Sequence, residues 1–396
     1  MFFSRPVIAL VGFLSVTSAL VVRTDDTGPT ATATSTPTPT PTPTPTAVPT
    51  GVFLTTKFLT VAGHTDAHAT VPGHTITLVL PTCIQTEIPD KNGFVPPGTC
   101  HALYDFYPSF AAAVLFSVLF GVVTALHIAQ AAKYKTTFCW VIIMACFWEF
   151  SSFVTRAIST KYQQNAGLAL VSQILVLIAP LWVNAFDYIV LGRMIHFFLP
   201  SHSILGISGS LLGIVFVMLD VVSFVVQLIG GSLAGPTAPE SEVFKGIHIY
   251  MGGIGLQQFF IVIFLGLAAR LHGQLRTLER NGTGKKNWRP LLFTLYASLG
   301  LITIRIFFRL IEFSAGKEAD KNPLPFHEVY FYVFEAVPML IALAAMNVVH
   351  PGSVLVGPDA DMPGLRTLLC GRRRTQNVRM EWNGMEVKNK AAYSRV

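Results

Sequence analysis

From Pro108 onward, long apolar runs alternate with short polar breaks. Seven runs can be delimited, and each is long enough to cross a hydrocarbon core about 30 Å thick at about 1.5 Å per helical residue. Lipid offers no water to backbone N–H and C=O groups, so each run is predicted to be a helix. The predicted spans are 108–131, 137–158, 168–191, 204–229, 246–270, 290–312 and 326–348.

The composition agrees with this pattern. Only 12% of the 396 residues are charged and 52% are apolar, whereas ordinary soluble domains are about 25% charged. A soluble surface cannot be covered with so few charged side chains, which excludes most cytosolic enzymes. Disorder of the whole chain is excluded by its apolar content. The fold class predicted from sequence is therefore all-α, a seven-transmembrane-helix bundle over residues 106–350.

The first segment, residues 1–20, has the pattern of a secretory signal peptide. Arg5 supplies a basic start, residues 7–16 are apolar, and the small residues 17–19 suit cleavage. An uncleaved signal anchor is the alternative, because the apolar character continues to Val22. Residues 21–50 are mostly Thr, Pro and Ala, a composition that cannot form a packed core. They are predicted to be a disordered stalk, either O-glycosylated or a plain linker.

Residues 51–105 form a small segment that the signal peptide would place outside the cell. Alternating apolar and polar positions predict a strand over Thr75–Leu80. In an oxidising compartment Cys83 and Cys100 are predicted to form a disulfide. The histidines of this segment lack the spacing of a zinc site, so no metal is expected.

The distribution of basic residues predicts the orientation in the membrane. Four lysines lie in the loops of one side: Lys161, Lys245, Lys317 and Lys321. On the other side lie 17 basic residues, in three loops and in the tail over 351–396. The positive-inside rule then places the tail in the cytosol and the N-terminus outside. An odd number of spans and a signal peptide lead independently to the same orientation. The expected location is the plasma membrane, reached through the secretory pathway.

Several ionisable or polar residues interrupt the apolar spans. Such groups are costly in lipid and usually face the interior of a bundle. Two pairs, Glu149 with Arg156 and Glu328 with Glu335, have the seven-residue spacing that puts side chains on one helix face. The set forms a candidate ligand-binding polar seam: Glu149, Arg156, Asp187, Asp220, Gln227, Arg305, Arg309, Glu312, Glu328 and Glu335. Alternatively, these residues pair between helices and only stabilise packing.

Blocks of residues in this region resemble the fungal RTA-like proteins, a lipid-translocating exporter family linked to aminocholesterol resistance. The resemblance covers roughly residues 103–352. Its matching residues are Tyr104, Tyr107-Pro108-Ser109, His127, Tyr134, Glu149, Arg156, Ala179-Pro180, Leu191-Gly192-Arg193, Asp220 to Gln227, Gly230-Gly231, Arg305 to Phe313, Gly316, His327-Glu328, Tyr332, Glu335, Pro338-Met339 and His350-Pro351. The Thr/Pro stalk and the long external segment depart from the family pattern.

The resemblance implies a seven-helix membrane protein that moves or exports amphipathic lipids and gives resistance to lipid stress. Membrane lipids would be its partners, in the class of a sphingoid base, a phospholipid or a sterol-like molecule. A seven-helix sensor or receptor for lipid stress is the alternative, and a scaffold is a weaker one. No nucleotide, metalloprotease or catalytic serine motif is present. We therefore expect no enzyme, no cofactor and no nucleic-acid partner.

Overall fold

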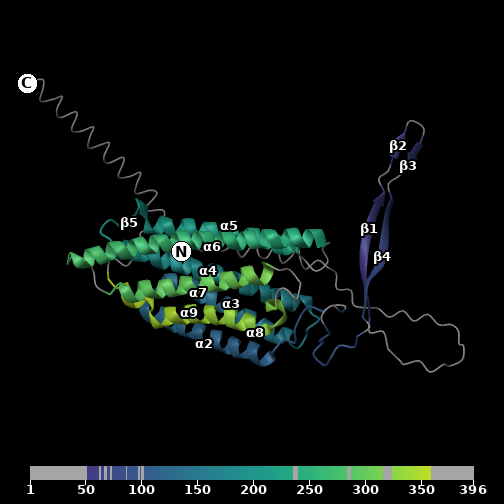
Figure 1. Ribbon diagram of the computed structural model, residues 1–396, viewed down its shortest axis with the longest axis horizontal. Coiled ribbons are helices and arrows are strands. Elements are labelled where there is room, and N and C mark those ends of the chain that lie inside the picture. The colour runs from purple at the N-terminus through teal and green to yellow at the C-terminus, as the bar shows by residue number, and fades with distance from the viewer. Residues whose placement is uncertain are drawn as a thin grey trace, which may run out of the picture. The chain divides into compact units, whose positions relative to one another are not determined.

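A computed structural model describes most of the chain outside its two ends. It contains seven helices that are long and apolar enough to cross a membrane, as the hydropathy pattern predicts. These helices lie side by side with their axes roughly along one direction, and short segments connect them (Figure 1). The described residues are 51–61, 64–66, 69–71, 74–85, 87–96, 99, 102–234, 240–282, 287–314 and 323–357. The predicted signal peptide, the stalk and the tail beyond residue 357 lie outside them.

Helices adjacent in sequence pack against each other, and the last one closes the ring onto the first. The spans are α2 (Phe110–Tyr134), η1 (Thr137–Cys139) with α3 (Trp140–Ser159), α4 (Ala166–Phe198), α5 (Gly209–Leu233), α6 (Glu240–Arg280), α7 (Arg289–Ser314), and α8 (Glu328–Phe331) continuing into α9 (Val337–Val348). Two short helices, η2 (Leu324–Phe326) and α10 (Pro351–Val354), flank the last span. Helix α9 contacts both α7 and α2.

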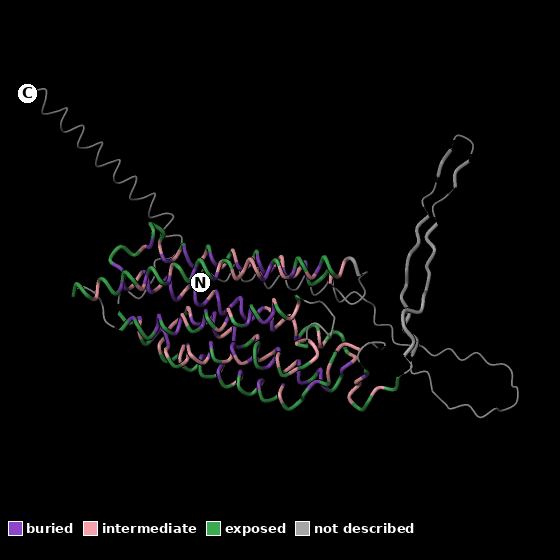
Figure 2. The backbone as a smooth tube through the Cα atoms, viewed as in Figure 1, coloured by how far each residue is buried: buried purple, intermediate pink, exposed green. Residues whose placement is uncertain are grey.

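Helix α4 occupies the centre, because it contacts α3, α5, α6 and α7. Buried residues line the helix surfaces that face one another, and exposed ones lie outside (Figure 2). The exposed positions of the outer helices include large apolar side chains, such as Leu115, Val118 and Val122 on α2. An apolar exterior around a partly polar interior is the arrangement expected of a membrane bundle.

Several helix ends differ from the ends of the predicted apolar spans. Leu205 and Gly206 form the turn between β5 (Ser203–Ile204) and β6 (Ile207–Ser208), with Gly206 at a φ of +77°, so the fourth span begins only at Gly209. Helix α4 continues past Leu191 to Phe198, and α6 continues past Arg270 to Arg280. The end of an apolar run indicates where the chain leaves the lipid. The helix itself can continue beyond that point, until its end is capped.

Ahead of the bundle, residues 51–85 form antiparallel strand pairs. Strand β1 (Gly51–Val61) pairs with β4 (His74–Gln85), and β2 (His64–Asp66) pairs with β3 (Ala69–Val71). The strand predicted over Thr75–Leu80 is confirmed within β4. Cys100 and the side chain of Cys83 are outside the described part of the chain, so the disulfide stays a prediction.

The last transmembrane helix contains a wider turn. Residues 332–336 form a π-helix, η3, which ends two residues before Pro338. Its hydrogen bonds run from residue i to i+5, and such turns occur frequently at functional sites. The turn contains Glu335, one of the candidate polar residues.

Glycines allow α5 and α6 to approach closely. A Cβ atom added to Gly230 would overlap the backbone nitrogen of Tyr250 and lie 2.7 Å from the carbonyl oxygen of Gly246. One added to Gly231, the next residue, would have nothing within 4 Å. Small residues at helix interfaces let backbones pack in van der Waals contact.

We therefore expect Gly230→Ala to destabilise the protein by about 1–3 kcal/mol, the usual cost of overpacking. Gly231→Ala is the matched control, and it should be neutral or slightly stabilising because alanine favours helix more than glycine does. Thermal unfolding of both purified variants in detergent measures the difference. Equal melting temperatures would show that the α5–α6 contact tolerates a methyl group.

Candidate functional site

An ion pair joins the last transmembrane helix to α3 at the end of the bundle where α2 begins, here called the Ser109 end. Nη2 of Arg156 lies 2.9 Å from Oε1 of Glu328, and both side chains are 9% exposed. The second carboxylate oxygen, Oε2, accepts a hydrogen bond of 2.6 Å from the backbone N–H of Ser109, the N-cap residue of α2. Glu328 thus connects α3 with the N-terminus of α2, where a negative charge is favoured by the helix dipole.

An aromatic ring separates this ion pair from a second group of charges. The guanidinium carbon of Arg156 lies 4.1 Å from the ring centre of Phe331, and that of Arg309 lies 5.9 Å from the same ring. Aromatic faces attract cations, more strongly when water is excluded. Phe331 therefore contacts both charged groups.

The second group is centred on Glu335, whose carboxylate contacts two arginines of α7. It accepts hydrogen bonds from Nε and Nη2 of Arg309 at 3.0 and 3.2 Å, and it forms a salt bridge with Arg305. Arg309 also binds Glu312 at 2.8 Å. The side chains of Glu335, Arg305 and Arg309 are 2%, 7% and 4% exposed, so water screens these ion pairs little.

Arg305 also satisfies a backbone carbonyl inside α4. Proline at position 180 has no N–H, so the carbonyl of Val176, four residues earlier, lacks its usual helical partner. Nη2 of Arg305 donates to this carbonyl oxygen at 3.2 Å. The side chain of Arg305 therefore links the proline position of α4 to Glu335 on the last helix.

Glu149 on α3 lies beside this group but has a different environment. It is 2% exposed and interacts electrostatically with Arg305, Arg309 and Glu335. Within the described part of the chain it forms no hydrogen bond or salt bridge, whereas Glu328 and Glu335 each bind arginine. Glu149 is thus the carboxyl of this region that no arginine binds directly.

Two further carboxyls lie deeper in the bundle. Oδ2 of Asp220 accepts hydrogen bonds of 2.9 Å from Nδ2 of Asn184 and from the hydroxyl of Tyr188. Oδ2 of Asp187 accepts one of 2.7 Å from the hydroxyl of Ser298 on α7. Asp187 is eleven residues after Val176 on α4, which places it about 16 Å further along the helix.

The remaining candidate, Gln227, lies apart from the charged groups. Its Nε2 donates to Oε1 of Gln257 at 3.0 Å, which links α5 to α6. The structure therefore brings together seven candidates at the Ser109 half of the bundle, places two in the deeper group and leaves Gln227 in a separate contact. The seven, here called the ion network, are Glu149, Arg156, Arg305, Arg309, Glu312, Glu328 and Glu335.

Two acids with helical spacing bind arginines of different helices. Glu328 and Glu335 are seven residues apart, which predicts one shared face. In the structure Glu328 binds Arg156 of α3 and Glu335 binds the arginines of α7. Glu335 lies within the π-helix Tyr332–Ala336, whereas Glu328 starts the α-helical turn before it.

Several partners in the site were missed at the sequence level. They are the backbone of Ser109, the carbonyl of Val176, Tyr188, Ser298 and Phe331. Tyr188 could have been found, because it follows Asn184 by four residues on the same face of α4. The roles of the two backbone groups cannot be read from the side chains of Ser109 and Val176. Pro180 does indicate, however, that the carbonyl of Val176 lacks its helical partner.

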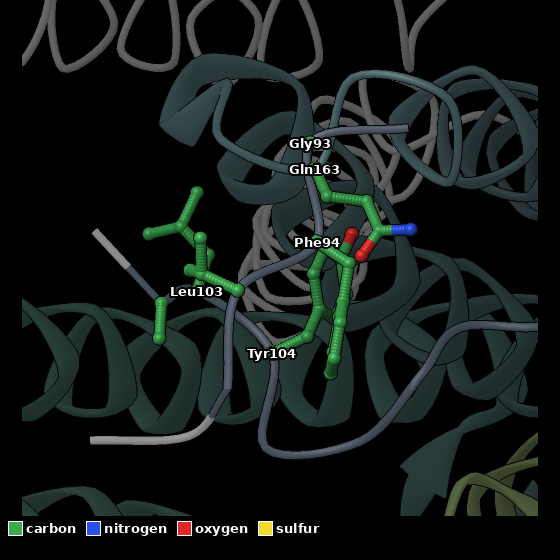
Figure 3. A pocket seen from close by; sticks show the side chains of 7 residues that line it. Gly93, Phe94, Leu103, Tyr104 and Gln163 are labelled. Carbon is green, nitrogen blue, oxygen red and sulfur yellow. The ribbon is translucent and has the colours of Figure 1, made fainter. Parts of the chain in front are cut away.

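The segment before α2 is tied to the Ser109 end. The hydroxyl of Tyr104 lies 2.6 Å from Oγ of Ser159, and the N–H of Gln163 donates to the carbonyl of Asn92 at 3.1 Å. Figure 3 shows the small pocket between them, of about 10 Å³, which has room for one water molecule. It is too small for a lipid, so this segment covers the helix ends without offering a lipid-sized site there.

Comparison with known proteins identifies the family. The family model described as "RTA1 like protein" matches residues 142–357, more than half of the chain. A protein of Emericella nidulans named "Probable lipid transporter atnI" is 45% identical over 292 residues, which cover 72% of this chain and 76% of the relative. The chain belongs to the RTA1-like family. No solved structure matches.

Other relatives of this RTA1-like protein are more distant. The sphingoid long-chain base transporter RSB1 of Saccharomyces cerevisiae is 24% identical over 65% of this chain and 75% of the relative. Protoporphyrin uptake protein 1 of the same species is 27% identical over 62% of this chain and 91% of the relative. The family match contains all ten candidate polar residues, from Glu149 to Glu335. The family and its seven helices identify a multi-pass integral membrane protein.

Proposed function

We propose that this RTA1-like protein moves an amphipathic lipid with a cationic head group across the membrane. The name of its relative in Emericella nidulans supports lipid transport, and that of the more distant yeast relative supports a sphingoid base, whose head carries an amine. We further propose that the protein acts in the plasma membrane and gives resistance to lipid stress.

The observation that carries the preference for a cation is the surplus of acidic groups inside the bundle. The ion network contains four carboxyls and three guanidinium groups, so one of its carboxyls has no basic counterpart within the network. A buried charge is stable only when it is paired or neutralised. A protonated amine entering the bundle would supply a positive charge where the protein has too few.

Glu149 is the residue that we assign to this amine. Glu328 and Glu335 already receive hydrogen bonds from arginine, and Asp220 receives two from neutral donors. Glu149 receives none from the described residues, and it belongs to the same electrostatic group. An ammonium group could bind Glu149 without displacing an arginine from its partner.

The proposal is tested by following a labelled sphingoid base in cells and in reconstituted vesicles. Cells that contain the protein should export the base faster and survive higher concentrations of it than cells without the protein. Glu149→Gln keeps the size of the side chain and removes its charge, and it should reduce export at least about tenfold, the factor that corresponds to 1.4 kcal/mol of lost head-group binding.

Glu279→Gln serves as the matched control, because the side chain of Glu279 on α6 is 37% exposed and binds only Arg289 among the described residues. Its export should equal that of the wild type. A neutral phospholipid in place of the base tests the preference for a cation. Equal export with and without the protein would refute transport, and equal export by Glu149→Gln and wild type would refute the assignment of Glu149.

A further inference from the structure

Two carboxyls of the bundle take no part in the ion network. We infer that Asp187 and Asp220 are proton-binding sites, and that the protons they exchange are coupled to lipid movement. The coupling rests on the proposed function, whereas the binding of protons does not. The proton would bind to the carboxyl oxygens that receive no hydrogen bond in this structure.

Each carboxyl has one satisfied and one unsatisfied oxygen. Oδ2 of Asp187 accepts from Ser298, and Oδ2 of Asp220 accepts from Asn184 and Tyr188. Oδ1 of each is buried and has no hydrogen-bond partner among the described residues. Oδ1 of Asn184, whose Nδ2 points at Asp220, is buried and unpaired as well. These three oxygens are acceptors without donors.

Binding of a proton would give each of these buried carboxyls a donor and remove its negative charge. Asp187 is 0% exposed and Asp220 is 1% exposed, so neither carboxyl is solvated by bulk water. An isolated carboxylate in such an environment is strongly disfavoured, and the group takes up a proton instead. A protonated carboxyl has one O–H donor, and so it converts an unpaired acceptor into a group able to donate.

Among the described residues, no basic side chain pairs with Asp187 or Asp220. Helix α4 packs against α3, α5, α6 and α7, and α5 packs against α4 and α6. Tyr188 interacts electrostatically with both carboxyls. The other ionisable groups within the spans of these helices form no hydrogen bond or ion pair with either carboxyl among the described contacts. They are Cys146, Glu149 and Arg156 on α3, Arg193 and His196 on α4, Glu242, Lys245, His248, Tyr250, Arg270, His272, Arg276, Glu279 and Arg280 on α6, and Arg289, Tyr296, Arg305, Arg309 and Glu312 on α7.

The position of the two sites suits coupling. Asp187 lies about 16 Å along α4 from Val176, whose carbonyl binds Arg305 of the ion network. Helix α4 therefore contacts both the ion network and the two carboxyls. A shift of α4 that accompanies lipid binding would change the surroundings of Asp187, Asn184 and Tyr188 together, and with them the affinity for the proton.

The first experiment measures proton binding without any lipid. Infrared difference spectra of the purified protein, titrated with pH, should show the C=O stretching band of a protonated carboxylic acid at neutral pH. Asp187→Asn and Asp220→Asn should each remove part of this band, and Glu279→Gln should leave it unchanged. Asparagine keeps the size of aspartate and an acceptor oxygen, so both variants are expected to fold. A band that is the same in both variants and in the wild type would overturn proton binding.

The second experiment measures coupling in vesicles loaded with a labelled sphingoid base. A pH gradient should accelerate base movement by the wild type and by Glu279→Gln, and Asp187→Asn and Asp220→Asn should lose that acceleration. An unchanged response in both variants would overturn coupling, as would a sodium gradient at uniform pH that drives the wild type equally well. If the wild type moves no lipid at all, the proposed function and the coupling both fail, whereas the infrared bands still decide whether the carboxyls bind protons.

Discussion

Glu335→Ala should leave little folded protein in the membrane. This one carboxylate binds both Arg305 and Arg309, and all three side chains are almost fully buried. Removing one partner of a buried ion pair typically costs about 3–5 kcal/mol, because a charge remains without compensation. Here two guanidinium groups lose a partner at once, so the expected loss is at the upper end of that range. The measurement is the yield and the melting temperature of purified protein in detergent.

Glu312→Ala is the matched comparison for this variant. Glu312 also binds Arg309, but its side chain is 15% exposed and Arg309 would retain Glu335. The expected loss is about 1 kcal/mol, typical of a partly exposed ion pair. Glu335→Gln should fall between the two, since it keeps acceptor capacity and loses the charge. Similar melting temperatures for Glu335→Ala and Glu312→Ala would contradict the central place of Glu335.

Arg156→Ala should have the second largest effect, about 3 kcal/mol. It removes the partner of Glu328 and the cation above Phe331, and it leaves Glu328 with the N–H of Ser109. Arg156→Lys should recover only part of the loss, because an ammonium group lacks the planar shape that stacks on a ring. Thermal unfolding in detergent gives both values.

A double-mutant cycle separates this ion pair from its surroundings. If Arg156 acts chiefly through Glu328, then Glu328→Ala added to Arg156→Ala should cost little more than Arg156→Ala alone, with a coupling energy of about 1–3 kcal/mol. Strictly additive losses would show that the two side chains stabilise the bundle independently, and that the 2.9 Å contact contributes little.

The seven helices were predictable because lipid imposes one requirement on every spanning segment. A run such as residues 290–312 must bond its backbone internally, so hydropathy alone located α7 to within two residues at each end. The ends of α4 and α6 were not predictable in this way, because Arg193 and Arg280 lie in helix that extends beyond the apolar run. Nothing in hydropathy distinguishes a helix that stops at the lipid boundary from one that continues.

The membership of the ion network was predictable, and its pairing was not. Residues such as Arg305 and Glu335 stand out in an apolar run whatever their partners are. The partners depend on tertiary neighbours, and one of them, the carbonyl of Val176, is a backbone group. Arg305 and Arg309 do share a partner, as their four-residue spacing indicates.

The wide turn at Tyr332–Ala336 has a consequence for comparing this helix with those of homologues. A π-helical turn takes up more residues than an α-helical one, so it behaves as a one-residue insertion absorbed without breaking the helix. A homologue lacking that residue would present the residues that follow the turn to different neighbours, even if the two sequences looked alike. Aligning such helices therefore requires an offset of one residue within Tyr332–Ala336, so that Pro338 and the rest of α9 are compared with their structural counterparts.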